Sequence, residues 1–306
     1  MTNEFDILRQ FSLGDHLSDI EKHRDIVDRF GLRCVSDGIN IYLENPLELL
    51  DPELLRGAIP AAAQQHLSRL DIHWTLGSTN SYVLNLSSSS EFHGYVCLAE
   101  QQTAGRGRRG RHWVSPFGKN IYLSLGWLMP TDQPIEGLSL AVGTCVAKAI
   151  GSVSETKVNL KWPNDILLEG GKAAGILVEL AGGSDAGRRL VIGVGINLAL
   201  SREDAGLIDQ PWSVVEKVSR NDLVAALITE LATGLSTFSR TGFSSFRESW
   251  QALDAHAGLE VSILASDSVQ TGISRGVNAS GNLILETSEG RKIFNAGEVS
   301  LRVTAK

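Results

Sequence analysis

The residues between 158 and 200 constrain the fold most, because they hold four β-rich segments in direct succession. The segments are VNLKW, DILLE, AAGILVELA and RRLVIGVGINLAL, separated by proline, glycine or polar turns. Short apolar runs bounded by such turn residues are typical of strands. Upstream, GYVCLAEQQ and NIYLSLGWLM are two further strand candidates. The central part of the chain is therefore expected to be built on one sheet.

Two longer segments near these strands have the spacing of helices. GLSLAVGTCVAKAIG closes on glycine, and RNDLVAALITELATGLSTFSR is amphipathic, with Asn221 as the expected N-cap before Leu223. Strands in sequence with helices grouped on one side indicate an α+β fold, in which helices back a mixed β-sheet. We assign this body to residues 65–256.

The two ends of the chain differ from this body. In residues 1–48, two short helical segments, FDILRQF and HLSDIEKHRDIVDRFG, precede a predicted β-hairpin of LRCV and INIYL with a turn at Asp37 and Gly38. Two helices followed by a hairpin suggest a small, degenerate winged-helix-like module. Residues 257–306 contain five short strand candidates with glycine or Asp/Ser turns, which predict a small closed β-barrel.

Composition narrows the classes of function. The net charge of −7 and a pI near 5.5 disfavour a general nucleic-acid-binding protein. No apolar run approaches the length that spans a bilayer, and the first residues are acidic where a secretory signal is basic. Cys34, Cys97 and Cys145 are scattered and form no CxxC pair, which fits a reducing compartment and offers no zinc site. We therefore expect a cytoplasmic protein.

A short basic segment is the first candidate for binding chemistry. Residues 105–111 read GRGRRGR, with four arginines and three glycines. Glycine lets the backbone approach a ligand closely, and the planar guanidinium of arginine suits phosphate or carboxylate. The same composition occurs in solvated basic loops and in RNA-binding tracts. Its place between a predicted strand and Trp113 favours an anion-binding loop that is mobile until a polyanion neutralises it.

Two more polar segments lie at the ends of predicted elements. In KWPND (161–165), a lysine ends an apolar strand and would be costly to bury without an anionic partner, while Asn and Asp offer oxygen ligands for a hard cation. The plainer interpretation is a strand corner whose lysine reaches solvent. In GSTN (77–80), the hydroxyl groups are good helix caps and are equally suited to clamp a polar ligand.

Glycines also interrupt two of the β-rich segments, KAAGILVE (172–179) and GVGIN (193–197). Small residues within a strand often mark a place where a ligand or another backbone comes close. GVGIN lacks the GxGxxG spacing and no helix follows it, so a nicotinamide cofactor is not indicated.

Taken together and in this order, these segments resemble the biotin protein ligases. The matching stretches are STN (78–80), QTAGRGRRGRHW (102–113), SPFGKNIYLSL (115–125), KWPNDILL (161–168), KAAGILVEL (172–180), GVGINLAL (193–200), GISRGV (272–277) and GEVSLR (297–302). The resemblance covers about residues 70–306. It implies a catalytic domain of the biotinyl/lipoyl ligase type and an SH3-like barrel after it.

The resemblance further implies a two-step reaction at one site. Biotin and MgATP form biotinyl-5′-adenylate and pyrophosphate, and a lysine of a biotin carboxyl carrier domain then attacks the mixed anhydride and releases AMP. Both steps can proceed by positioning and charge stabilisation, without an enzyme nucleophile. This fits a sequence in which we recognise no Ser-His-Asp or Cys-His arrangement.

Roles for individual residues follow from the same resemblance. Contacts with biotin are expected from Ser78, Thr79, Asn80, Gln102, Arg106, Gly107, Arg108 and Lys161. Contacts with ATP or the adenylate are expected from Arg111, Trp113, Asn197, Trp212 and Arg302. Lys161 and Arg108 are the expected catalytic residues, with Lys161 on the biotin carboxylate and the α-phosphate. Asn164 or Asp165 is expected to touch Mg²⁺, and Asp165 is the candidate ligand.

Two features depart from the family's pattern. His112 stands where a lysine is common, so no ATP role is carried over to it. Only about thirty residues precede the hairpin, too few for the three helices of a full winged helix-turn-helix. Residues 1–45 contain nine acidic and five basic side chains, the wrong sign for a DNA-binding face.

We therefore predict a remnant module that does not bind DNA. The alternatives are a lipoate or octanoate ligase of the same fold and a biotin-sensing DNA-binding repressor. Family members often dimerise by sheet extension, which allows a homodimer here.

Overall fold

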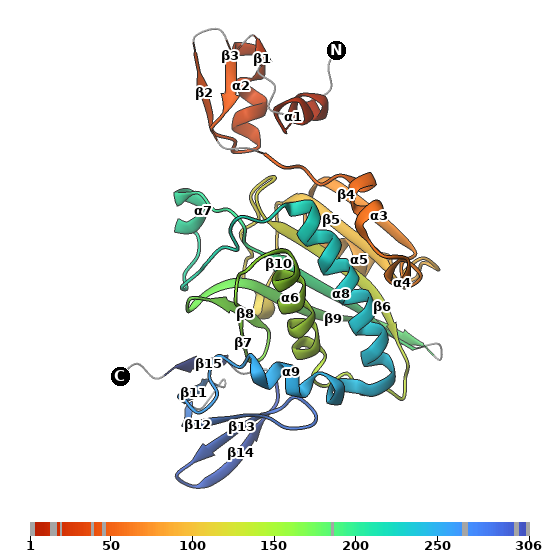
Figure 1. The fold of residues 1–306 in the computed structure, drawn as a ribbon, viewed down its shortest axis with the longest axis vertical. Helices are drawn as coiled ribbons and strands as arrows, with labels where there is room; N and C mark the ends of the chain where they lie inside the picture. The colour runs from red at the N-terminus through yellow and green to blue at the C-terminus, as the bar shows by residue number, and fades with distance from the viewer. Residues whose placement is uncertain are drawn as a thin grey trace.

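The computed structural model describes residues 4–12, 17–18, 20–37, 40–44, 47–184, 187–264, 269–296 and 300–303. Three sheets follow one another along the chain: a three-stranded sheet at the N-terminal end, a seven-stranded sheet in the centre and a five-stranded sheet at the C-terminal end (Figure 1). In these ranges, no helix is long and apolar enough to cross a membrane.

The central sheet has the strand order β4-β5-β6-β10-β9-β8-β7. Its strands are β4 (Arg69–Leu76), β5 (Tyr95–Gln102), β6 (Ile121–Met129), β7 (Asn159–Lys161), β8 (Asp165–Leu168), β9 (Gly171–Ser184) and β10 (Gly187–Ile196). β4 and β5 pair in parallel, and the other pairs are antiparallel. The predicted mixed sheet and its six predicted strand segments are confirmed. β4 is an additional strand at the edge.

Helices cover both faces of this sheet unequally. On one face, α6 (Leu138–Val153) and α8 (Arg220–Thr241) pack against each other and against the strands, with α3 (Pro52–Ala58) and α4 (Ala61–Gln64) beside α8 (Figure 1). This face holds the main apolar core, to which β5 contributes Val96 and Leu98. The alternate residue Cys97 belongs to a second core under α5 (Thr79–Asn85). Because side chains alternate along a strand, α5 lies on the opposite face.

The start of α8 differs from the sequence prediction. Ser219 is its N-cap and accepts a hydrogen bond from the Asp222 amide, so the prediction of a cap at Asn221 was wrong. Asn221 lies within the first turn, where its Nδ2 donates to Glu48 at 2.8 Å and its Oδ1 accepts from the Asp51 amide. Tertiary contacts with the segment before α3 thus explain why this residue is polar.

The N-terminal module consists of α1 (Glu4–Ser12), β1 (Leu17–Ser18), α2 (Ile20–Arg29), β2 (Cys34–Ser36) and β3 (Asn40–Leu43). The hairpin is confirmed by the antiparallel pairing of β2 and β3, whereas its predicted turn residue Gly38 lies outside the described residues. β1 was not predicted and pairs with β3. Leu8 and Phe30 pack with Leu47 and Phe117, so apolar contacts join the module to the central body.

The tail forms one antiparallel sheet of order β14-β13-β12-β11-β15. Its strands are β11 (Glu260–Leu264), β12 (Val269–Val277), β13 (Leu283–Thr287), β14 (Gly290–Phe294) and β15 (Ser300–Val303). The five predicted strands are confirmed, while closure of the sheet into a barrel stays a prediction. The Trp162 indole nitrogen donates to the Gly281 carbonyl at 3.1 Å, so this sheet packs on the corner that carries KWPND.

The remaining helical segments are α7 (Arg202–Gly206), α9 (Arg247–Ala252) and two short 3-10 turns, η1 (Arg108–Gly110) and η2 (Gly242–Ser245). The body ends just after α9, where β11 begins. The boundaries of 65–256 and 257–306 between the body and the tail stay a prediction.

A buried histidine at this junction makes stability depend on pH. Burial, followed by the charge of Lys161, lowers the pKa of His256 from 6.5 to about 4. Between these pH values the unfolded chain binds a proton that the folded protein does not, so stability is expected to fall as the pH falls through this window. Asp254 acts in the opposite direction, because burial raises its pKa.

We expect His256→Gln to lose less stability than the wild type when the pH is lowered from about 7 to about 5. Urea unfolding midpoints at both pH values measure this difference. Equal losses in the two proteins would contradict the role of His256.

Candidate functional site

The arginine-glycine loop forms a hairpin of its own. Arg106 pairs with His112 in an isolated antiparallel bridge, and the Gly107 amide donates to the Arg111 carbonyl at 2.8 Å. At the tip, Arg109 and Gly110 have φ values of 59° and 70°. Glycine adopts such values without steric cost. The structure thus gives the loop a hairpin conformation, and its mobility without a ligand stays a prediction.

Three adjoining cavities lie around this hairpin. The first, which we call the amide cavity, collects polar groups from three elements: the start of α5, the end of β5 and the loop. It is lined by Ser78, Thr79, Asn80, Gln102, Arg106, Gly107, Arg108, Trp113, Tyr122, Leu123, Asn164, Lys172, Gly175, Ile176, Leu177, Gly193, Val194 and Gly195. Seven of the eight residues predicted to contact biotin are among them.

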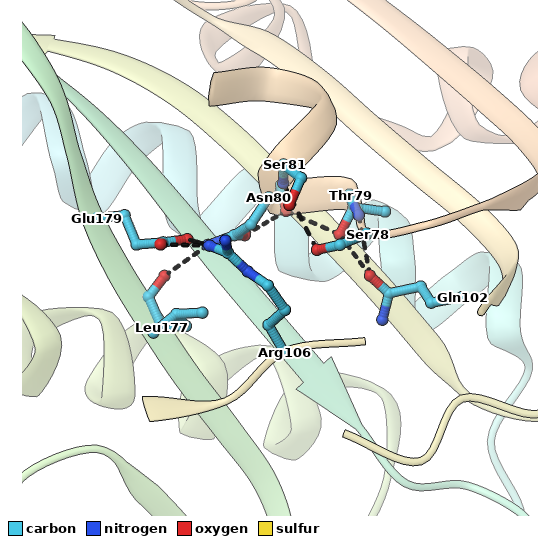
Figure 2. A network of polar contacts seen from close by, with 9 residues as sticks. Ser78, Thr79, Asn80, Ser81, Gln102, Arg106, Leu177 and Glu179 are labelled. Atoms are coloured by element: carbon cyan, nitrogen blue, oxygen red, sulfur yellow. Dashed lines mark hydrogen bonds and ion pairs between the residues drawn. The ribbon is translucent and has the colours of Figure 1, made fainter. Parts of the chain in front are cut away.

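A continuous hydrogen-bond network holds the polar groups of the amide cavity (Figure 2). Gln102 Oε1 accepts from the Thr79 amide at 2.9 Å and from its hydroxyl at 3.1 Å. Ser124 Oγ bridges Thr79 Oγ1 at 2.8 Å and Asn80 Oδ1 at 2.5 Å. Ser78 also caps α5, because its Oγ accepts from the Ser81 amide. Helix capping and cavity lining are therefore both present in this segment.

Two glycines of β10 make room for this arrangement. A Cβ on Gly193 would lie 2.1 Å from Asn80 Oδ1, and one on Gly195 would lie 2.5 Å from the Trp113 indole ring. The sequence predicted that a ligand or another backbone comes close at these glycines; side chains fill the space instead, and the approach of a ligand stays a prediction. A Cβ on Gly175, on the neighbouring strand, would lie 3.0 Å from the same indole.

The second cavity, the arginine cavity, is lined by Gly107, Arg108, Arg109, Arg111, His112, Trp113, Lys161, Trp162, Pro163, Asn164, Asp165, Lys172, Gln210 and Leu301. Arg108 Nη1 donates to Asn164 Oδ1 at 2.9 Å, and its Nη2 donates to the Ala296 carbonyl. Burial lowers the pKa of Arg108. Asn164 Nδ2 donates to the Ile176 carbonyl at 2.9 Å, so this residue holds Arg108 against β9. Lys161 lines this cavity and not the amide cavity.

The third cavity, the tryptophan cavity, contains Trp113 and Trp212. Its lining residues are Arg111, His112, Trp113, Val114, Lys172, Asn197, Leu207, Ile208, Asp209, Gln210 and Trp212. Asn197 Nδ2 donates to the carbonyls of Lys172 and Ser213. Four of the five predicted ATP residues thus come together. The side chain of Arg302 lies outside the described residues, although its backbone pairs with Ser262 in the tail sheet.

Lys172 is the central residue that the sequence analysis missed. It lines all three cavities, its Nζ lies 2.6 Å from Asp165 Oδ1, and it stands 5.4 Å from the centre of the Trp113 ring. The side chains of Lys172 and Asp165 are each 16% exposed. The available signal was a lone lysine at the start of an apolar strand, after two glycines. Its partner becomes visible only once β8 and β9 are paired.

The chain matches two family models of protein ligases. The biotin/lipoate A/B protein ligase family matches residues 75–197, and the biotin protein ligase C-terminal domain matches residues 256–302. The chain is 36% identical over 301 residues to the bifunctional ligase/repressor BirA of Escherichia coli (strain K12), covering 96% of this chain and 92% of that protein.

Two further relatives agree. The biotin–[acetyl-CoA-carboxylase] ligase of Paracoccus denitrificans is 34% identical over 237 residues, covering 72% of this chain and 96% of that protein. The structure of a biotin protein ligase from Aquifex aeolicus in complex with biotin and ATP superposes with a TM-score of 0.66 at 27% identity, covering 77% of this chain and 99% of that chain. The chain therefore belongs to the biotin/lipoate A/B protein ligase family and, within it, to the biotin protein ligases.

Proposed function

We propose that this protein activates biotin with MgATP to biotinyl-5′-adenylate and transfers the biotin to a lysine of a biotin carboxyl carrier domain. One observation carries the proposal: Lys172 and Trp113 line three adjoining cavities whose chemistry differs. The amide cavity suits the ureido head of biotin, the arginine cavity its carboxylate and the phosphates, and the tryptophan cavity the adenine.

The chemistry of the first step needs fixed positive charge. A carboxylate that approaches a triphosphate sets anion against anion, and more negative charge gathers as the α-phosphorus becomes pentacoordinate. Arg108, Lys161 and Lys172 all line the arginine cavity, where Asp165 orients the Lys172 ammonium. Because positioning and charge stabilisation are sufficient for both steps, the chain does not need a nucleophile of its own.

The predicted contact of Lys161 with the biotin carboxylate and the α-phosphate stays a prediction. Lys161 shares the arginine cavity with Leu301 of the tail, and its charge acts on His256. The position of Lys172 between all three cavities favours it for the central role, with Lys161 as a second cation on the phosphate side.

The described residues do not form a metal centre by themselves. They contain no group of three or more His, Cys, Asp or Glu side chains suited to hold a metal ion, and the carboxylate of Asp165 is paired with Lys172. Magnesium is commonly held by one or two carboxylates together with substrate phosphates. We therefore expect Mg²⁺ to enter on ATP, with Asp165 as the candidate protein ligand.

Transfer of label to a carrier tests the proposed function. Purified protein, labelled biotin, MgATP and a carrier domain are incubated, and the carrier is assayed for label on one lysine. Labelled lipoate and octanoate run in parallel, because ligases for these acids share the fold. We expect ATP-dependent transfer of biotin. Transfer of lipoate without transfer of biotin would refute the proposal.

The amide cavity predicts a specific effect of Gly193→Ala. The new Cβ would lie 2.1 Å from Asn80 Oδ1 and displace a side chain that is hydrogen-bonded on several sides. We expect the KM for biotin to rise by about tenfold or more, with a smaller change in the KM for ATP. Gly183→Ala is the control, since the nearest atom to its Cβ would be at 3.8 Å. An unchanged KM for biotin in Gly193→Ala would contradict the assignment.

We further propose that the N-terminal module does not bind operator DNA. Its acidic balance supports this, and α1 and α2 are the only helices before the hairpin in the described part of the module. The Escherichia coli relative, a ligase/repressor, aligns over nearly the whole chain and makes the repressor the alternative. A gel-shift assay with the protein's own upstream operon DNA, biotin and ATP distinguishes a module that does not bind DNA from a repressor. A specific, salt-sensitive shift would favour the repressor.

A homodimer is proposed through the edge of β9. β8 pairs with residues 171–175 of β9. In the described part of the chain, the residues of β9 after 175 pair with β10 on one side and with no strand on the other. Leu180 lies there and is 59% exposed. Light scattering with and without biotin and ATP measures the mass, and Leu180→Lys should weaken any dimer. A dimer insensitive to this change would place the interface elsewhere.

We place this activity in the cytoplasm. All three cysteines are free, and Cys97 and Cys145 are buried, which suits a reducing compartment. Cell fractionation tests the location, and enzyme found with exported proteins would contradict it.

A further inference from the structure

Glu179 on β9 has no part in the reaction proposed above, yet it contacts two predicted biotin residues (Figure 2). Its Oε2 accepts a hydrogen bond from Asn80 Nδ2 at 2.8 Å, and both of its oxygens face the Arg106 guanidinium in an ion pair. The side chains of Glu179 and Arg106 are 26% and 39% exposed. The contact therefore lies at the solvent-facing rim of the amide cavity, where water competes for it.

On its inner side, Glu179 fixes the orientation of the Asn80 amide. Asn80 Nδ2 donates to Glu179 and to the Leu177 carbonyl, while Oδ1 accepts from Ser124 Oγ. An ionised carboxylate only accepts hydrogen bonds, so the amide nitrogen and not the amide oxygen must face it. Glu179 thereby presents Asn80 to a ligand in one orientation.

On its outer side, Glu179 holds the arginine-glycine loop at its first arginine. Other contacts hold this region: Arg108 in the loop binds Asn164 and the Ala296 carbonyl, and Trp113, just after the loop, packs against Gly195. Unlike these contacts, the Arg106 contact with Glu179 joins two charged side chains. It can therefore be cancelled by removing a charge while the size of the side chain is kept.

We propose that Glu179 is a positioning residue, which keeps the loop closed over the acyl-adenylate through Arg106. This inference rests on the proposed function. Arg106 and Gly107 line the amide cavity, so a closed loop covers its ligand. The adenylate must be retained until the carrier lysine arrives, because a released mixed anhydride would acylate other amines. Through the Arg106 contact, Glu179 acts on this retention and not on the formation of the adenylate.

The test uses the full chain loaded with labelled biotin and ATP, without a carrier. Excess unlabelled biotin is added, and the rate at which labelled adenylate leaves the protein is measured. Glu179→Gln keeps an oxygen for Asn80 but removes the charge that Arg106 pairs with. We expect release about tenfold faster than in the wild type, with the KM for biotin within about threefold. Glu179→Ala also removes the acceptor for Asn80 and should raise both quantities.

Two controls separate this role from a general loss of structure. Glu286→Gln is matched, because Glu286 pairs with Arg275 Nε at 2.5 Å on the tail sheet, with both side chains about half exposed; its release rate should stay at the wild-type value. Arg106→Gln combined with Glu179→Gln should release adenylate no faster than the faster single variant. Urea midpoints report on the folding of each protein.

Three results would overturn the inference: unchanged release in Glu179→Gln, equal acceleration in Glu286→Gln, or multiplied effects in the double variant. These outcomes are distinct from a failure of the proposed function. If the wild type forms no adenylate, the proposed function fails and this inference fails with it. If the wild type forms adenylate and Glu179→Gln retains it normally, only the inference fails.

Discussion

Replacing Lys172 by alanine is expected to lower the rate of biotinyl-adenylate formation by a factor of about 10²–10³, the usual effect of removing one group that stabilises transition-state charge. We expect this large effect because Lys172 is only 16% exposed, lines all three cavities and is oriented by Asp165. Single-turnover formation of labelled adenylate measures this step directly.

Substitutions at two other lysines serve as comparisons for this result. Lys161→Ala should lower the rate less, by about tenfold, because Lys161 borders the arginine cavity alone of the three. Lys148→Ala, at an exposed position on α6, should have no effect. The opposite result would assign the central role to Lys161: adenylate formation by Lys172→Ala within about threefold of the wild-type rate, and loss of adenylate formation in Lys161→Ala.

The second large effect concerns stability and not activity. Arg220→Ala is expected to destabilise the protein by about 3–5 kcal/mol, since it leaves a buried carboxylate without its partner. Arg220 Nη2 lies 2.8 Å from Glu100 Oε2, and the side chains are 5% and 3% exposed. Glu100 Oε1 also accepts from the Leu50 amide at 2.6 Å. The pair thus joins β5, α8 and the segment that leads to the N-terminal module.

Urea unfolding at neutral pH measures this loss. Arg275→Ala is its control, because Arg275 forms a half-exposed ion pair with Glu286 and should cost less than about 1 kcal/mol. Arg220→Met combined with Glu100→Gln should be more stable than Arg220→Ala, because it removes both charges together. Equal losses of unfolding free energy in Arg220→Ala and Arg275→Ala would contradict a stabilising role for the buried pair.

The strands of the body could be predicted from sequence because their patterns are local. Apolar runs separated by turn residues identified β5 to β10 and the five strands of the tail. β1 is only two residues long, and its pairing with β3 is a tertiary contact that no local pattern announces. The cap of α8 was misplaced for a related reason. Ser219 and Asn221 are both good capping residues and both contact Glu48, but Ser219 accepts from the Asp222 amide of the helix, whereas Asn221 Oδ1 accepts from the distant Asp51 amide.

The site was predictable where the chemistry lies in a contiguous motif. The loop 105–111 and the segment 78–80 reached the same cavity, as the resemblance implied. Lys172 and Glu179 were not identified, because their roles depend on strand register. β9 contributes both, and Lys172 meets Asp165 only through the pairing of β8 with β9. Both lie in a β-rich segment with small residues, and this local pattern does not indicate the partner of either side chain.

Exchange of labelled pyrophosphate into ATP reports on the formation of the bond between biotin and the α-phosphate in these cavities, and it needs no carrier. We expect exchange that requires biotin and MgATP together and that nearly disappears in Lys172→Ala. Exchange supported by lipoate and not by biotin, or no exchange with a folded wild-type protein, would contradict the proposed function.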